Sequence, residues 1–509
     1  MNETSSLAGT IDRGSDWTVE TLESYDREIA RIARQFRLDT YPNQIEIITS
    51  EQMMDAYASS GMPINYHHWT FGKRFIEIES SYRRGLMGLA YEVVINSNPC
   101  IAYLMEENSS AMQGLVIAHA CYGHNSFFKG NYLFRTWTDA SAIIDYLAFA
   151  RKFIADCERR FGYQEVESVL DACHALKSHG VDRYKRPDRI SIEEEERRQA
   201  EREELVQRQV NDLWRTFPEK KRRADAAESE ERFPSEPQEN ILYFIEKNAP
   251  LMKPWQREIV RIVRKIAQYL YPQQLTKTMN EGWATFWHFN ILHELHRQGL
   301  VSDSFMIEFL HHHTNVIFQP AYDSPYYSGI NPYTLGFTLF QDIRRVCEKP
   351  TDEDRVWFPD LVGTPWLDAV HFAMANFKDE SFILQYLSPK VIRDLRLFML
   401  VDDSDQQEME ITAIHNTAGY QRLREELASE YNLNEAIPNI QVDRVNVMGD
   451  RSLVLRHEMK NSQPLEKSDC MQVLSQLHKL WGFDVYLESI KDGEVVSTAS
   501  YPPEDEPAE

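Results

Sequence analysis

The chain has 509 residues, of which 42% are hydrophobic and 26% are charged. This is the composition of a globular protein, and the length is sufficient for a large core and more than one domain. The formal net charge of −24 repels phosphate backbones and anionic lipid, so general nucleic-acid binding is not expected.

Residues 1–14 are polar and lack the apolar segment of a signal peptide. No apolar run approaches the about 20 residues that a transmembrane helix needs. The six cysteines show no close pairing such as Cys-x-x-Cys, which is typical of reduced thiols. We therefore expect a cytoplasmic protein without a membrane span.

Up to about residue 400 the apolar spacing is mostly helical, beginning with 17–37. The exception is a pair of β-rich runs, 89–96 and 100–105, which flank an Asn-Pro turn and predict a hairpin. Further helices are expected over 111–124, 138–160, 163–178, 240–270 and 276–298.

Segment 191–215 is rich in Glu, Arg and Gln and is predicted as a solvated helix, and 217–239 as a linker or exposed loop. Near residue 405 the pattern changes. Strands are expected over 410–415, 440–447, 452–459 and 484–490, and helices over 419–431 and 467–481. The order βαββαβ predicts a C-terminal α/β ferredoxin-like domain over 405–509, after a mostly helical body over 1–400.

A motif over 280–288 contains Glu281 and His288, seven residues apart. In a helix both lie on one face, about two turns from each other, so one ion held by both needs a bend or a helix end. The alternative is a helix that packs through its aromatic residues, with Glu281 as a buried hydrogen-bonding partner.

A second motif, over 119–124, contains His119 and His124. Five residues correspond to about 140° around an ideal helix, so the two imidazoles share an ion only if the helix is bulged or ends between them. Gly123 is the expected place for such a break. The alternative is one core histidine and one capping residue.

Many zinc peptidases have an edge strand, then a helix with two histidines, and then a later helix that supplies a Glu. This chain has the same order in strand 100–105, helix 111–124 and Glu281. This order predicts a zincin-like core. Those enzymes use the Glu directly after the first His as general base, and this chain has Ala120 there. A hydrolase would need another base, and Glu106, Glu107 and Glu281 are the candidates by motif.

Other candidates lie within and beyond the motifs. The run 311–313, three histidines, is a candidate metal patch or a surface tract at a helix end. Cys121 is a candidate ligand, although lone thiols mostly pack. Tyr326, Tyr327 and Tyr333 are candidates for stabilising an oxyanion, with aromatic packing as the alternative.

Six stretches of the sequence resemble the stage V sporulation protein R (SpoVR) family, and the resemblance runs nearly end to end. They are 38–46, 61–66, 95–99, 119–128, 279–288 and 330–333. The resemblance implies a link to spore cortex formation, and so to modified peptidoglycan, and a role in stress or stationary-phase envelope physiology. It also implies a PrkA-type serine kinase and a von Willebrand factor A-domain protein as partners.

The block Glu281-Gly-Trp-Ala is similar to a segment of gluzincin-like peptidases in which that Glu binds zinc. The first hypothesis is therefore a metalloprotein that holds zinc or another divalent metal through His119, His124 and Glu281, with His288 as fourth ligand or outer partner. As a hydrolase it would act on peptides or peptidoglycan fragments.

Two alternatives stay open. One is a non-enzymatic regulatory or scaffold protein of a serine-kinase-linked stress module. The other is a helical iron or manganese carboxylate protein, which needs an extra Glu-x-x-His pair that the motif helices do not show.

Overall fold

The computed structural model describes residues 10–12, 14–59, 65–84, 92–184, 233–234, 236–401, 410–412, 416–433, 437–447, 449–459 and 464–503. The chain forms two compact units. The first comprises Met1–His174 and Pro254–Pro438, and the second comprises Ala175–Lys253 and Asn439–Glu509. The predicted charged helix (191–215) and residues 217–232 of the predicted linker lie outside the described residues.

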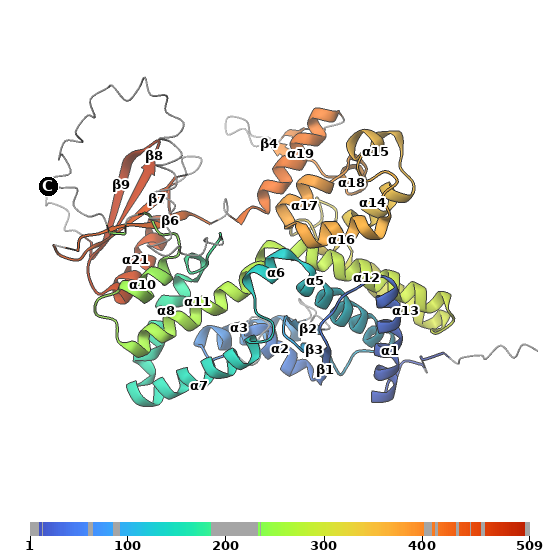
Figure 1. Ribbon diagram of the computed structural model, residues 1–509, viewed down its shortest axis with the longest axis horizontal. Helices are drawn as coiled ribbons and strands as arrows, with labels where there is room; N and C mark the ends of the chain where they lie inside the picture. The colour runs from blue at the N-terminus through green and yellow to red at the C-terminus, as the bar shows by residue number, and fades with distance from the viewer. Residues whose placement is uncertain are drawn as a thin grey trace, which may run out of the picture. The chain divides into compact units, whose positions relative to one another are not determined.

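The first unit is mainly helical, as expected from the spacing of its apolar residues (Figure 1). Its central helices are α1 (Val19–Gln35), α4 (Ser110–Val116), α5 (Asn125–Gly130), α12 (Lys277–Arg297), α13 (Asp303–Val316) and α14 (Pro332–Glu348). Its other helices are α2 (Ser50–Ala58), α3 (Trp69–Arg83), α6 (Tyr132–Trp137), α7 (Ile143–Phe161), α8 (Tyr163–Ala175), α11 (Pro254–Leu275), α15 (Asp352–Trp357), α16 (Trp366–Asn376), α17 (Asp379–Tyr386), α18 (Pro389–Asp394) and α19 (Thr417–Glu430). No described helix is long and apolar enough to cross a bilayer.

A three-stranded sheet lies beside these helices. The predicted hairpin is present, because β2 (Glu92–Ile95) pairs antiparallel with β3 (Cys100–Met105). On its other side β3 pairs in parallel with β1 (Asn43–Ile48), so the strand expected at the edge is the central one. Every residue of β3 is buried, which is the pattern of a strand covered on both faces.

The centre of the first unit is aromatic. Trp283 and Phe286 of α12 are fully buried and lie against Phe340 of α14, with ring centroids 5.3 and 6.0 Å apart. The backbones of α12 and α14 meet at Gly282 and Gly336. A Cβ on Gly336 would lie 2.1 Å from the carbonyl oxygen of Thr278, so no larger residue fits there.

The second unit contains a four-stranded sheet in the order β6-β7-β8-β9. Its strands are β6 (Asn439–Val445), β7 (Leu453–Glu458), β8 (Val485–Lys491) and β9 (Glu494–Tyr501), and its helices are α10 (Ile241–Asn248), α21 (Lys467–Trp481) and the short 3₁₀ helix η2 (Lys177–His179). β7 and β8 are parallel and joined by α21, whereas the β6-β7 and β8-β9 pairs are antiparallel.

The ferredoxin-like arrangement expected for 405–509 is wrong, although the six predicted elements occur in the predicted order. The first strand, β5 (Glu410–Thr412), pairs with β4 (Met399–Val401) in a separate two-stranded sheet. The first helix, α19, buries Tyr420 and Leu423 in the core of the first unit. β9 was not predicted, and it closes the sheet beside β8 with a largely exposed strand.

Candidate metal centre

The two motif histidines lie on a π-helix, η1 (Ile117–His124), which continues directly from α4. A π-helix closes its hydrogen bonds between residues five apart, so side chains five apart lie on one face. The i, i+5 spacing of His119 and His124 therefore fits one site. The expected distortion is present, but it extends over all eight residues. Gly123 allows close packing, since a Cβ there would lie 2.6 Å from the Cα of Ala284 on α12.

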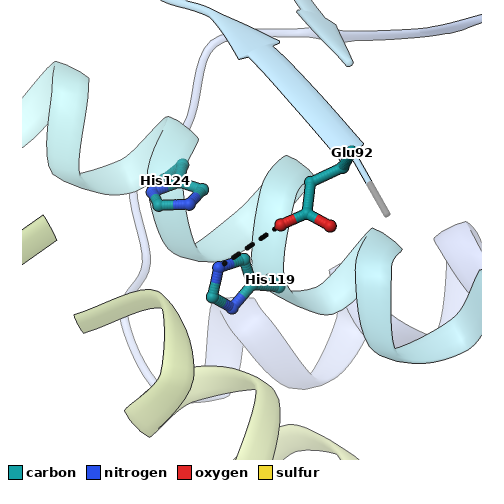
Figure 2. A group of neighbouring side chains, drawn as sticks. All are labelled: Glu92, His119 and His124. Carbon is teal, nitrogen blue, oxygen red and sulfur yellow. Dashed lines mark ion pairs between the residues drawn. The ribbon is translucent and has the colours of Figure 1, made fainter. Parts of the chain in front are cut away.

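Four ligand-type side chains meet at this face of η1. Nε2 of His124 lies 3.4 Å from Oε2 of Glu281, and Nε2 of His119 lies 3.7 Å from the same oxygen. Nε2 of His119 is also 3.6 Å from Oε1 of Glu92. Figure 2 shows Glu92, the first residue of β2, pointing toward His119, while both imidazoles project from one helix. The structure thus brings His119, His124 and Glu281 together and adds Glu92.

The three separations, 3.4, 3.6 and 3.7 Å, are close to those between the ligands of a tetrahedral ion, and Glu92, His119 and His124 form a group that could hold a metal. With metal–ligand bonds of about 2.0–2.1 Å, ligand atoms of a tetrahedral zinc site lie about 3.3–3.5 Å apart. Within the described part of the chain, Nε2 of His119 and Oε2 of Glu281 are buried without a hydrogen-bond partner. Buried polar atoms normally have partners, so a ligand between these two atoms, which face each other, would satisfy both.

The charges of the site act on each other. Burial alone would raise the pKa of Glu281, but His124 and His119 hold it below its usual value. Burial alone would lower the pKa of His124, but Glu281 raises it above its usual value. Burial raises the pKa of Glu92, although the charges of His119 and His124 act to lower it. The two carboxylates therefore differ in their readiness to take up a proton.

Outer partners orient both imidazoles. Nδ1 of His124 is 2.9 Å from Oδ1 of Asn280, and Nδ1 of His119 is 2.9 Å from Nδ1 of His288. The other nitrogen of His288, Nε2, is 2.8 Å from Nδ1 of His313 on α13. Both nitrogens of His288 are thus engaged by imidazoles, and the structure places this residue behind His119 rather than at the ligand face. Seven residues of helix, about 10 Å, separate it from Glu281.

Two phenols border the site. The ring of Tyr333 is stacked at 6.2 Å from that of His119. Glu281, together with burial, raises the pKa of Tyr333 well above its usual value. The hydroxyl of Tyr57 on α2 donates to the carbonyl oxygen of Glu92 at 3.2 Å, and burial with the charges of Glu92 and Glu281 raises its pKa. Both phenols stay protonated, and because the O–H of Tyr57 is engaged by Glu92, Tyr333 is the potential hydrogen-bond donor to a ligand.

The other predicted bases lie elsewhere. Glu106 and Glu107 are exposed in the turn after β3, and Oε1 of Glu107 accepts from the backbone N–H of Ser50. Ala120 is fully buried in the main hydrophobic cluster, so a Glu at this position would point into the core. Besides Glu281, the carboxylate that faces His119 is Glu92 of β2.

Sequence reasoning missed Glu92 and Tyr57 and placed His313 in a separate metal patch or surface tract, although a signal existed for Glu92 and for the burial of His313. Alternation along β2 puts Glu92 on the same face as Val94, which packs against the main core. An acidic residue on a core-facing strand position is unusual. His313 follows the buried Phe305 and Phe309 at i+8 and i+4, so it lies on the buried face of α13.

The remaining candidates do not join the site. Within the run 311–313, His311 is exposed and only His313 is buried. Cys121 is buried in the hydrophobic core, and burial raises the pKa of its thiol well above its usual value. Tyr326 is 83% exposed.

A second group of ligand-type side chains, His68, Glu167 and Asp171, lies where the start of α3 meets α8. Nε2 of His68 is 3.2 Å from Oδ1 of Asp171. Trp69 donates to both carboxylates, from its backbone N–H to Glu167 and from Nε1 to Asp171. These contacts hold the N-terminus of α3 on α8 and explain the group as structural.

Known proteins resemble the chain over nearly its whole length. Residues 16–436 match the SpoVR like protein family, and residues 438–492 match the SpoVR-like C-terminal domain. The chain belongs to the SpoVR family. An uncharacterized protein of Escherichia coli (strain K12), YcgB, is 61% identical over 494 residues, which cover 97% of this chain and 96% of that protein. No solved structure matches the chain, so the zincin-like core stays a prediction.

Proposed function

We propose that this SpoVR-family chain is a metal-dependent hydrolase of peptides or peptidoglycan fragments. His119, His124 and Glu281 bind one divalent ion, and Glu92 is the general base. The observation that carries the proposal is that Oε2 of Glu281 lies 3.4 and 3.7 Å from the two imidazoles and Glu92 lies 3.6 Å from His119, with two of these atoms buried without hydrogen-bond partners.

Zinc fits this donor set best. Two imidazoles and one carboxylate are the ligands of several catalytic zinc sites, in which a further position remains open. When bound, the ion would supply a Lewis acid that activates water and polarises a carbonyl group. A fully closed site would instead use Glu92 as fourth ligand and would be structural.

The residues around the ion have separate tasks. Glu281 keeps its negative charge between the two imidazoles and offsets the charge of the ion. Glu92 approaches from β2, outside the motif helices, and can take up a proton at Oε1. The protonated phenol of Tyr333, whose ring stacks on His119, is the candidate hydrogen-bond donor to a developing oxyanion, and the hydroxyl of Tyr57 holds the backbone of Glu92.

Metal analysis of purified variants tests the proposal. We expect one bound ion per wild-type chain, its loss in Glu281→Gln, and its retention in Glu294→Gln, a control on the same helix whose carboxylate pairs with Arg297 away from the site. Glu92→Gln should keep the ion but lose hydrolysis of a muropeptide and peptide mixture followed by mass spectrometry. A wild-type chain that takes up no ion, or a Glu92→Gln variant with normal turnover, would contradict the proposal.

The alternative is a non-enzymatic regulatory or scaffold protein of a serine-kinase-linked stress module. It predicts that Glu281→Gln leaves the metal content unchanged. The free energy of unfolding should fall only by the about 1–3 kcal/mol that a buried hydrogen-bonding group contributes. The PrkA-type serine kinase and the von Willebrand factor A-domain protein stay predicted partners under either function.

A further inference from the structure

We propose that His288 and His313 are positioning residues that set the tautomer of His119, so that metal binding at His119 is linked to the protonation pattern of His313 two rings away. This inference rests on the proposed metal centre. It concerns three imidazoles on three different helical elements, η1, α12 and α13.

The three rings form a continuous hydrogen-bonded chain. Nδ1 of His119 faces Nδ1 of His288 at 2.9 Å, and Nε2 of His288 faces Nδ1 of His313 at 2.8 Å. The exposed fractions are 2% for His119, 0% for His288 and 4% for His313. Because burial disfavours a charged imidazole, the ring of His288, which lies between the other two, carries one proton.

With one proton on His288, and with neutral rings on either side of it, the chain of contacts can run in only two directions. A neutral imidazole has one N–H donor and one acceptor nitrogen, so choosing the donor of one ring fixes the others. In the first arrangement, Nε2 of His119 is protonated, and the N–H groups of His288 and His313 point toward His119. In the second, Nδ1 of His119 donates to His288, and Nε2 of His288 donates to His313.

Only the second arrangement leaves the lone pair of Nε2 on His119 free for an ion. Conversion from the first requires that Nε2 of His119 releases a proton and that Nε2 of His313 takes one up. Between these ends, one proton passes from Nδ1 of His313 to Nε2 of His288, and one from Nδ1 of His288 to Nδ1 of His119. The chain holds three protons before and after, and no ring is left charged.

The linkage gives His313 an effect on metal affinity without contact to the ion. A ring nitrogen at position 313 accepts the N–H of His288 and so favours the binding tautomer. Outer partners of this kind typically change metal affinity by about 10–100-fold. Simple packing of α13 against α12 would not require an acceptor at this position.

Zinc affinity of the full-length chain, measured by competition with a chelating indicator, tests the role of the acceptor. We expect His313→Phe to weaken zinc binding by about 10–100-fold. His313→Asn should restore most of it, because the amide oxygen of Asn can stand in for Nδ1. His312→Phe, on the neighbouring half-buried position, is the control and should bind as wild type. His313→Phe with wild-type affinity would overturn the inference.

The tautomers themselves are read by long-range ¹H–¹⁵N spectra of chain labelled at histidine. On addition of zinc, we expect the proton of His313 to move from Nδ1 to Nε2. An unchanged His313 tautomer in a chain that binds zinc would overturn the linkage and leave the metal centre intact. A wild-type chain that binds no zinc would overturn the metal centre and this inference together.

Discussion

Glu281 and Glu92 approach the same two imidazoles from different surroundings. Glu281 belongs to a long helix and lies between His119 and His124, which hold its pKa below the usual value. Glu92 begins a short strand, and burial raises its pKa. Opposite shifts in two neighbouring carboxyl groups are the pattern of a site in which one stays ionised and the other exchanges protons.

A carboxylate far from the site allows a test of pH dependence. Asp354 accepts two bonds from Arg345, at 2.6 and 2.7 Å, and one from the backbone N–H of Thr351. Burial alone would raise its pKa, but Arg345 and Thr351 lower it to about 2. Because the folded pKa is below the unfolded one, this stabilisation is complete above about pH 4 and is lost as the pH falls toward about 2.

We therefore expect Asp354→Asn to lower the free energy of unfolding by about 2 kcal/mol at pH 7, and by much less near pH 3. Urea unfolding at both pH values measures the difference. Asp352→Asn, at an exposed position of the same helix, is the control and should show no such trend. An equal loss at both pH values for Asp354→Asn would contradict the assigned ion pair.

At the scale of elements, the close approach of α12 to α14 sets the position of Glu281. Gly336→Ala places a methyl group against the backbone of Thr278 and should push the two helices apart. We expect a loss of about 1–3 kcal/mol of stability and weaker metal binding. Thermal unfolding with and without zinc measures both effects.

The control is Gly72→Ala in α3, where an added Cβ meets nothing within 4 Å. Replacing a glycine inside a helix at such a site should stabilise the chain by about 0.5–1 kcal/mol. If Gly336→Ala behaved like Gly72→Ala, the packing of α12 on α14 would not be as described.

Local patterns predicted most elements, and the failures have physical causes. The hairpin of β2 and β3 follows from two β-rich runs around an Asn-Pro turn. The parallel pairing of β1 with β3 joins segments more than 50 residues apart, and no local pattern encodes it. For the site, the i, i+5 spacing correctly implied a distorted helix, but the spacing alone does not distinguish a break from a π-helix.

At the scale of the whole molecule, one border between the two units coincides with the border between the two family matches, although residues 175–253 of the second unit lie within the first match. These matches meet between residues 436 and 438, and the C-terminal segment of the second unit begins at Asn439. The boundary predicted near 405 came from the first strand-like pattern after the helical body. The sequence does not reveal that α19 buries its apolar face in the first unit.

The second unit is built from two separate segments, which predicts how its fragments behave. Trp481 of α21 is 1% exposed and stacks on Phe244 of α10 at 6.0 Å, and Gln238 bridges Val442 of β6. A fragment of residues 439–509 lacks these partners. We expect a poorly dispersed ¹H–¹⁵N spectrum for it alone and a folded spectrum after addition of peptide 236–253. A well-dispersed spectrum of 439–509 without the peptide would contradict this organisation.

X-ray absorption at the zinc edge tests the metal centre most directly. For the wild-type chain loaded with one equivalent of zinc, we predict a shell of nitrogen and oxygen atoms at about 2.0–2.2 Å, with the outer scattering of two imidazoles and no sulfur. Glu281→Gln, loaded in the same way, should lack this spectrum. A sulfur shell at about 2.3 Å, or an identical spectrum in Glu281→Gln, would contradict the assignment of His119, His124 and Glu281 as ligands.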